Sequence, residues 1–335
     1  MSSQEAHPSP REQDQLIGHA DAEHTLLAAA RSARLHHAWL LTGAAGIGKA
    51  TLAFRFARWL LAAQDRRSSG DSLFLDPRDP VFRRVATGSH SDLITVARGY
   101  DEKRQRHRGE IVVEDVRPVG ELLRRTAAEG GWRVVIIDGA EFLNRNAMNA
   151  LLKLLEEPPP QTVLLLACAA PGRLLPTIRS RCRTLRLASL DDDAMRQVLL
   201  AHLPNQDPSE REALIGLARG SPGQALALAS EGGIALDGLV RELIASGGAS
   251  GSRAYQMADA VIRQEGGFAT FLTLLGDAIS VRVRDAARLA PGAGDPGDDI
   301  AIWQQIRRVQ DETERFNLDK RQALLSSLNL LASLS

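Results

Sequence analysis

The segment from Gly43 to Lys49, with the sequence GAAGIGK, is the part of the chain best suited to bind a phosphorylated ligand. It follows an apolar run, Ala38–Thr42, and precedes a helical pattern over Lys49–Ala62, which is the setting that a phosphate-binding loop requires. Glycines let backbone N–H groups converge on phosphate oxygens, and the start of a helix adds partial positive charge. The candidate nucleotide-binding residues of this loop are Gly43, Gly46, Gly48 and Lys49.

The residue after Lys49 departs from the usual pattern of such loops. A Ser or Thr normally stands there and binds Mg²⁺ through its hydroxyl group, but this chain has Ala50 at that position and Thr51 one place later. A shift of one residue rotates a helical side chain by about 100°. Thr51 is kept as a candidate nucleotide contact, but we expect it to be a poor replacement for the metal ligand.

A second apolar run, Val134–Ile137, ends in Asp138 and has the form of the strand whose aspartate supports Mg²⁺ in phosphate-loop ATPases. Hydrolytic members of this class place a glutamate directly after that aspartate, whereas Gly139 follows here. Relative to position 139, Glu141 would lie nearly 7 Å farther along a strand or be turned by about 200° on a helix. We therefore do not expect Glu141 to replace the missing glutamate. Loss of a positioned general base lowers a rate by about 10²- to 10⁴-fold. The residues therefore predict lost hydrolysis and leave nucleotide binding open.

The elements that position these residues follow a clear order. Between residues 14 and 189 short apolar runs alternate with helical patterns, which is typical of a parallel α/β sheet, and after Leu190 only helical patterns continue. The expected fold class is α/β, then all-α. The predicted divisions are a disordered tail over 1–13, a phosphate-loop NTPase-like domain over 14–189, a small helical domain over 190–231 and a larger helical domain over 232–335.

The composition excludes several classes of protein. Lys and Arg together number 41, as do Asp and Glu, so no excess of positive charge marks a dedicated nucleic-acid binder. Cys168 and Cys182 are the two cysteines, too few for a disulfide framework or a cysteine-ligated metal. No run approaches the roughly 18 apolar residues of a membrane span, so we expect no membrane contact and a cytoplasmic location.

Four blocks of the sequence resemble the clamp-loader branch of the AAA+ ATPases. They are His36–Gly43, Gly46–Lys49, Asn149–Pro159 and Leu174–Cys182, of which the last two are the most specific. The resemblance implies an AAA+ domain, a helical lid domain and a C-terminal helical collar that oligomerises. It also implies that Arg181, in a Ser-Arg-Cys motif, is an arginine finger that acts in trans on the nucleotide site of the adjacent subunit.

The same resemblance implies a subunit of the bacterial DNA polymerase III clamp loader, which loads a sliding clamp onto primed DNA. The implied partners are the gamma or tau ATPases and the delta subunit in a hetero-pentamer, and the implied ligand is ATP or ADP. Two more family positions are changed here, since sensor 1 falls on Ala169 and sensor 2 on Gly223, which cannot bind phosphate in the usual way. Residues 64–90, where many relatives carry a zinc module, contain no cysteine, so we expect no zinc.

Alternative interpretations of the sequence are weaker. A catalytically active clamp-loader ATPase of the gamma or tau kind requires a Ser or Thr where Ala50 stands and a glutamate where Gly139 stands. A phosphate-loop kinase would not explain the blocks Asn149–Pro159 and Leu174–Cys182. His90 and Asp92 are too few to form a metal site. A mixed-charge stretch is predicted to be a solvated hairpin tip rather than a DNA contact; its basic residues are Lys103, Arg104, Arg106 and Arg108.

Overall fold

A computed structural model describes residues 9–32, 35–67, 70–101, 106–129, 131–289, 297–316 and 318–332. The chain divides into two compact units, one formed by residues 1–204 with 219–224 and the other by 205–218 with 225–335. Of the expected tail, residues 1–8 lie outside the described residues, and the backbone carbonyls of Arg11 and Gln13 accept hydrogen bonds from Arg58. Lys103 and Arg104 of the mixed-charge stretch also lie outside the described residues.

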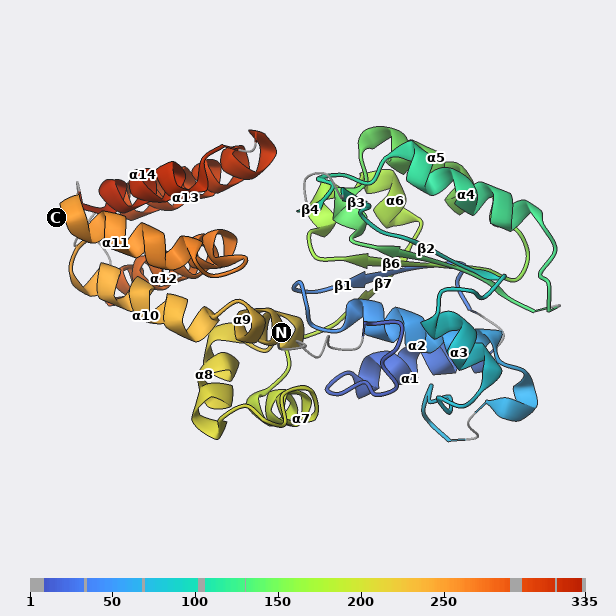
Figure 1. Ribbon diagram of the computed structural model, residues 1–335. Helices are drawn as coiled ribbons and strands as arrows, with labels where there is room; N and C mark the ends of the chain where they lie inside the picture. Colours follow the sequence, from blue (N-terminus) through green and yellow to red (C-terminus); the bar gives the residue numbers. More distant parts are fainter. Residues whose placement is uncertain are drawn as a thin grey trace. The chain divides into compact units, whose positions relative to one another are not determined.

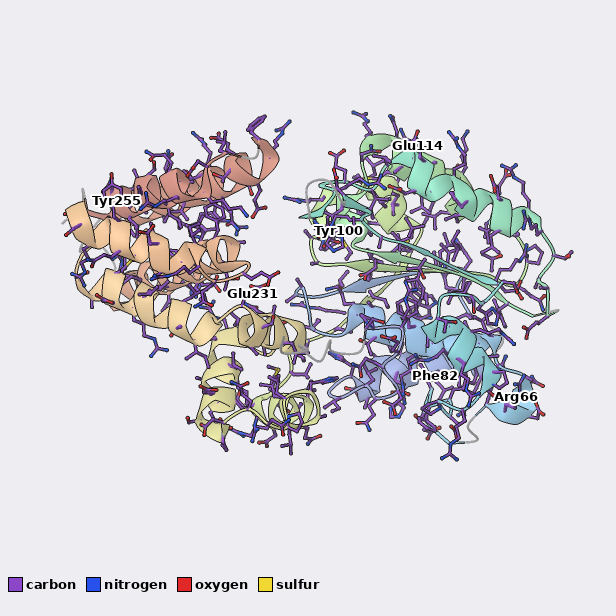
Figure 2. All side chains as sticks on the ribbon, viewed as in Figure 1. Arg66, Phe82, Tyr100, Glu114, Glu231 and Tyr255 are labelled. Atoms are coloured by element: carbon purple, nitrogen blue, oxygen red, sulfur yellow. The ribbon has the colours of Figure 1, made fainter. Side chains whose placement is uncertain are left out.

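The first unit is built on a sheet of five parallel strands in the order β2-β5-β6-β1-β7 (Figure 1). The strands are β1 (Ala38–Thr42), β2 (Leu93–Val96), β5 (Arg133–Asp138), β6 (Thr162–Cys168) and β7 (Arg183–Arg186). A separate antiparallel pair is formed by β3 (Tyr100–Asp101) and β4 (Arg106–His107). The ring of Tyr100, which is exposed (Figure 2), is nearly perpendicular to the His107 ring. The predicted parallel α/β arrangement is confirmed.

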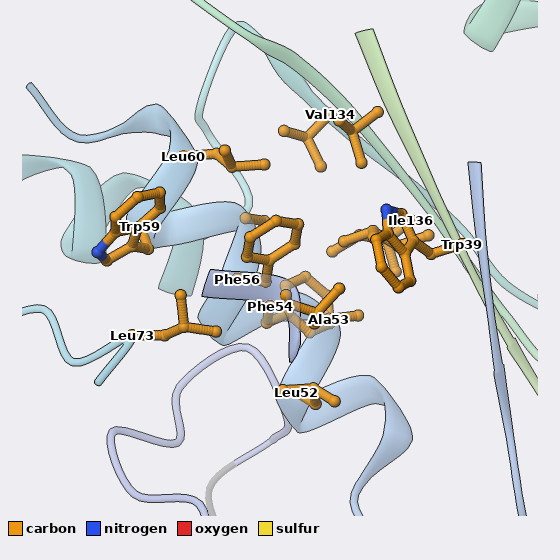
Figure 3. Packing of buried hydrophobic residues seen from close by; sticks show 14 of the residues in the cluster. Trp39, Leu52, Ala53, Phe54, Phe56, Trp59, Leu60, Leu73, Val134 and Ile136 are labelled. Carbon is orange, nitrogen blue, oxygen red and sulfur yellow. The ribbon is translucent and has the colours of Figure 1, made fainter. Parts of the chain in front are cut away.

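Helices cover both faces of this sheet (Figure 1). One face is covered by α1 (Ala20–Arg31), α2 (Lys49–Leu61) and α3 (Pro80–Ala86), and the other by α4 (Val113–Arg124), α5 (Arg145–Glu156) and α6 (Pro176–Ser180). Successive strand residues enter opposite cores because strand side chains alternate between faces. Trp39 packs with α2 on the first face (Figure 3), and Leu41 belongs to the same cluster. Leu40 packs with α4 and α5 on the second face. Burial on both faces explains why β1, β5 and β6 read as apolar runs.

The strand register brings three chain segments to one edge of the sheet. Thr42, at the end of β1, pairs with Cys168 at the end of β6, and Asp138 at the end of β5 pairs with Ala167. Because all three strands are parallel, the segments that follow them emerge at the same edge. Ligands of open α/β sheets bind at the carboxyl ends of the strands, so this register places the glycine-rich loop beside Asp138.

The second unit is helical, as the patterns after Leu190 predict. Its helices are α8 (Pro208–Ala218), α10 (Gly233–Ala245), α11 (Gly251–Ile262), α12 (Gly267–Leu289), α13 (Gly297–Phe316) and α14 (Lys320–Ala332). Helix α7 (Asp192–His202) belongs to the first unit, and α9 (Pro222–Ser230) begins in the first unit and continues in the second. The expected fold class, α/β followed by all-α, is confirmed.

Among the described residues, no single helix is both long and apolar enough to cross a membrane. Two neighbouring segments, Gly251–Ile262 and Gly267–Asp285, satisfy length and composition only when taken together, and the chain bends by 118° between them. Apolar side chains of both segments, including Met257, Phe271 and Leu275, are buried. Core helices of this kind satisfy the same criteria without any membrane.

Candidate functional site

The glycine-rich loop joins β1 to α2, and the side chain of Lys49 folds back into it. Only 8% of Lys49 is exposed, and its Nζ donates hydrogen bonds to the carbonyl oxygens of Gly43 at 2.8 Å and Ala44 at 2.6 Å. Burial lowers the pKa of Lys49, and the negative charges of Glu141 and Asp138 partly offset that shift. A lysine ammonium has three N–H donors, so one remains for a ligand at the loop.

Three carbonyl groups of the glycine-rich loop are hydrogen-bonded to residues outside the loop. The Ala45 carbonyl accepts from Ser221 Oγ at 2.8 Å, the Gly46 carbonyl accepts from the Gly223 N–H at 2.9 Å, and the Ile47 carbonyl is bonded to Nε2 of the buried His19. By contrast, the N–H groups of Ala45, Gly46 and Gly48 have no acceptor within the described part of the chain. Converging backbone N–H groups without acceptors form an anion-binding concavity. Sequence reasoning did not identify His19 or Ser221.

Gly223, the position expected for the sensor 2 arginine, packs directly on the loop. A Cβ atom at this residue would lie 2.8 Å from the Cα of Gly46, and a Cβ at Gly46 would lie 2.6 Å from Ser221 Oγ. Neither position has room for a side chain while the two hydrogen bonds are kept. The turn that opens α9 therefore meets the backbone of the glycine-rich loop through the Ser221 hydroxyl and the Gly223 N–H. We call Ser221, Gly223 and their two acceptor residues, Ala45 and Gly46, the backbone clasp.

The metal side of the site is incomplete. Ala50 and Thr51 both lie half-buried in the first turn of α2, and the Thr51 hydroxyl donates to no acceptor among the residues described. Asp138 ends β5, where burial raises the pKa of its carboxyl group and Lys49 opposes that shift. The structure therefore brings Asp138 and Lys49 into one charged cluster, whereas nothing in it ties Thr51 to them.

Glu141 joins this cluster, which sequence reasoning did not foresee. It lies in a short 3₁₀ turn, Ala140–Phe142, that directs the carboxylate to the thiol of Cys168 at the end of β6. Its Oε2 atom is buried and has no hydrogen-bond partner within the described ranges. Of the acidic groups that act on Lys49, Glu141 has the larger influence. Distance along the strand was a poor guide because the chain turns sharply after Gly139.

Gly139 makes that turn possible. Its φ is +79°, and a Cβ atom would lie 2.8 Å from Cδ2 of Phe142. A positive φ costs an L-residue about 1–2 kcal/mol. The residue directly after Asp138 is thus confined to glycine by backbone and packing together. A glutamate at this position would require a different local backbone.

Arg98 is a further charged group that sequence reasoning missed. It follows β2, and its guanidinium lies 3.8 Å from the centroid of the Phe142 ring. Its positive charge lowers the pKa of Asp138, which opposes the effect of burial. The only signal for it was its position just beyond a strand of the parallel sheet.

Arg181 lies away from the loop contacts, just after α6. Its side chain is 37% exposed, and its Nη2 is 2.9 Å from Oε1 of Glu156, the last residue of α5. Its Nη1 donates to the Thr177 carbonyl at 3.1 Å. The guanidinium is therefore held by two groups of its own chain, and the side chain is partly exposed.

The residues at the start of β2 have structural partners. The Asp92 carboxylate accepts from the N–H groups of Ala128 and Glu129, and His90 Nδ1 accepts from the Asp92 N–H. Across the described part of the chain, no three His, Cys, Asp or Glu side chains are grouped closely enough to hold a metal ion. His90 and Asp92 thus hold a loop in place.

Comparison with known proteins identifies the family. The DNA polymerase III, delta subunit family matches residues 18–191, which is more than half of the chain. The chain belongs to this family. It is 37% identical over 196 residues to the DNA polymerase III subunit delta' of Pseudomonas aeruginosa, covering 58% of this chain and 56% of that protein. The sequence motifs had indicated a subunit of the DNA polymerase III clamp loader; that resemblance is confirmed, and the relatives give it as one to delta-prime subunits.

Other relatives are more distant. The DNA polymerase III subunit tau/gamma of Haemophilus influenzae is 34% identical over 206 residues, covering 60% of this chain and 28% of that protein. A solved DNA polymerase III gamma subunit-related protein from Thermotoga maritima is 17% identical with a TM-score of 0.50, covering 92% of this chain and 98% of that one. This likeness shows that the two proteins share a fold. The chain spans little more than half the length of the delta' relatives it matches.

Proposed function

We propose that this protein is a clamp-loader subunit of bacterial DNA polymerase III that binds ATP or ADP without hydrolysing it. Its family and its delta' relatives support this assignment. The proposed partners are the gamma or tau ATPases and the delta subunit in a hetero-pentamer, and the proposed role is to support loading of a sliding clamp onto primed DNA in the cytoplasm. Arg181 is proposed to act on the nucleotide site of an adjacent ATPase subunit.

The glycine-rich loop fits the phosphates of a nucleotide. Gly43, Gly46 and Gly48 shape the loop, and the N–H groups of Ala45, Gly46 and Gly48 have no acceptor among the described residues. Lys49 keeps one ammonium N–H for a phosphate oxygen. Asp138, at the end of β5, is the carboxylate that would support Mg²⁺. A bound nucleotide would supply the anionic phosphates that these groups hold in place.

The observation that carries the loss of hydrolysis is the backbone at Gly139. The water-polarising glutamate of an active ATPase belongs at this position, where φ is +79° and Phe142 fills the space of a side chain. Ala50 also lacks the hydroxyl that binds Mg²⁺. Two catalytic requirements are missing at one site, while the phosphate-facing groups are kept.

An active ATPase of the gamma or tau kind is the second candidate, and one observation favours it. Glu141 lies beside Cys168, influences Lys49 and has a buried oxygen without a partner among the described residues. A carboxylate in that position is a candidate general base. If the purified chain hydrolyses ATP and Glu141→Gln abolishes the activity, this candidate replaces the first.

Two measurements test the main proposal. The purified chain should bind ADP in a titration, Lys49→Ala should weaken that binding, and ATP turnover should stay at background with Mg²⁺ present. In a complex reconstituted with the ATPase subunits, Arg181→Ala should leave assembly intact and lower clamp- and primer-stimulated ATP hydrolysis, because an arginine finger contributes about 10³- to 10⁵-fold to phosphoryl transfer. An unchanged rate would show that Arg181 is not a finger.

A further inference from the structure

Arg181 is held by two partners from its own chain. The Nη2 to Glu156 Oε1 distance is 2.9 Å, and Nη1 donates to the Thr177 carbonyl at 3.1 Å. Both terminal nitrogens of the guanidinium therefore have a partner within the chain, one in an ion pair and one in a hydrogen bond. The residues beside the pair, Leu155 and Ile178, are buried in the same apolar cluster. This packing holds the ends of α5 and α6 together and so keeps Glu156 within reach of Arg181.

The pair is placed to exchange partners rather than to stabilise the fold. Glu156 is 49% exposed and Arg181 is 37% exposed, so solvent weakens their attraction. Exposed ion pairs shift an equilibrium by only about 1.4- to 5-fold. A carboxylate and a phosphate both accept the guanidinium fork in bidentate geometry, and the phosphate carries more negative charge. An incoming phosphate can therefore displace Glu156 at a small cost.

We propose that Glu156 is a positioning residue that retains Arg181 on its own subunit until a nucleotide phosphate of the neighbouring ATPase subunit replaces the Glu156 carboxylate. This inference rests on the proposed trans role of Arg181. While Arg181 is paired with Glu156, it is not available to the nucleotide of the neighbouring subunit. The apparent affinity of that subunit for ATP is proportional to the fraction of molecules in which the pair is broken. The ion pair therefore weakens ATP binding at the neighbouring site by the factor that the pair itself contributes.

The expected effect is on KM rather than on kcat. The pair is broken when the nucleotide binds, before phosphoryl transfer. A substitution that removes the pair therefore favours the ATP-bound ground state and the transition state equally, relative to the complex without ATP. Glu156→Gln should lower the KM for ATP of the reconstituted complex by about 1.4- to 5-fold and leave kcat unchanged. Glu156→Asp, which keeps the carboxylate, should restore the wild-type KM at least in part. Arg181→Ala should lower kcat.

Glu157→Gln is the matched control, since it removes the same charge from the next residue, which is also exposed. Each substitution is made in the full-length chain, assembled with the ATPase subunits, and assayed with ATP in the presence and absence of Arg181→Ala. The inference is supported if Glu156→Gln lowers KM only when Arg181 is present and Glu157→Gln changes nothing. A purely structural role for Glu156 would give the same change with and without Arg181.

Three results would overturn the inference. With Glu156→Gln, they are an unchanged KM for ATP, a raised KM, or a change in KM that persists when Arg181→Ala is also present. In each case Arg181→Ala alone still lowers kcat. In those cases the finger assignment stands and the retaining role of Glu156 is wrong. If Arg181→Ala alone leaves kcat unchanged, the finger assignment fails and the role of Glu156 fails with it.

Discussion

The N–H of Gly223 donates a hydrogen bond to the carbonyl of Gly46 over 2.9 Å, and the two residues touch through their backbones. A conventional sensor 2 arginine at position 223 would need the space that Gly46 occupies. Ser221 adds a second bond from the same turn to Ala45. The turn that opens α9 thus supports the carbonyl groups of the glycine-rich loop, and no side chain extends from position 223.

Gly223→Ala should disturb this backbone clasp. The added Cβ would lie 2.8 Å from the Gly46 Cα and 3.0 Å from its carbonyl oxygen, both backbone atoms that cannot rotate away. Overpacking of this kind costs about 1–3 kcal/mol, so we expect a lower urea midpoint and weaker ADP binding. Gly216→Ala is the control, because nothing lies within 4 Å of a Cβ there and alanine favours its helix. Equal effects of the two substitutions would contradict the clasp.

Gly139→Glu, alone or with Ala50→Thr, should not restore ATP hydrolysis. The backbone of the new glutamate would have to keep a φ of +79°, and its side chain would have to displace Phe142. The carboxylate would therefore not reach the position it takes in an active ATPase. The backbone strain should lower the free energy of unfolding by about 1–2 kcal/mol. Phosphate release and thermal melting measure the two effects. Hydrolysis above background in the double variant would show that residue identity, not backbone, limits this site.

Both cysteine thiols should resist alkylation in the folded protein. Burial raises the pKa of Cys182 to about 12, and burial together with Glu141 raises that of Cys168 to about 11. At pH 8 the reactive thiolate should be depleted about 10²- to 10³-fold relative to an unfolded cysteine. Iodoacetamide labelling followed by mass spectrometry, with and without urea, measures the ratio. Comparable rates in both conditions would contradict the predicted burial of the thiols.

The same two thiols predict the direction of an alkaline effect on stability. Above about pH 9 an unfolded thiol loses its proton, whereas the folded thiols keep theirs up to their raised pKa values. The unfolded state then binds fewer protons, so the free energy of unfolding falls as pH rises through this window. Urea titrations at pH 8 and pH 10 should show a smaller fall for a Cys168→Ala, Cys182→Ala double variant than for the wild type.

Glu23→Gln should destabilise the first unit strongly. The Glu23 carboxylate is buried, pairs with Arg55 Nε at 3.1 Å, and accepts from Ser72 Oγ and the Leu73 N–H. Removing one partner of a buried pair leaves an uncompensated charge and costs about 3–5 kcal/mol. Asp21→Asn, an exposed change on the same helix, should cost less than about 1 kcal/mol. Chemical denaturation of the two variants compares them directly.

The sequence by itself determined the local elements and the glycine-rich loop. The apolar run Ala38–Thr42 forms β1, and the helical pattern over Lys49–Ala62 forms α2, Lys49–Leu61. These predictions succeeded because apolar periodicity and proline positions are properties of neighbouring residues. β7 was missed, since Arg183–Arg186 is polar and mostly exposed and becomes a strand only by pairing with β1.

Tertiary structure alone decided what surrounds the loop and the arginine. Ser221 is 176 residues from Ala45, and Glu156 is well separated in sequence from Arg181, so no local pattern connects either pair. The sharp turn at Gly139 likewise returned Glu141 to Lys49, against the expectation from spacing along a strand. Hydrogen bonds and ion pairs between distant segments depend on where the chain returns in space. That return is set by packing of the whole sheet and its helices, which spacing in the sequence does not encode.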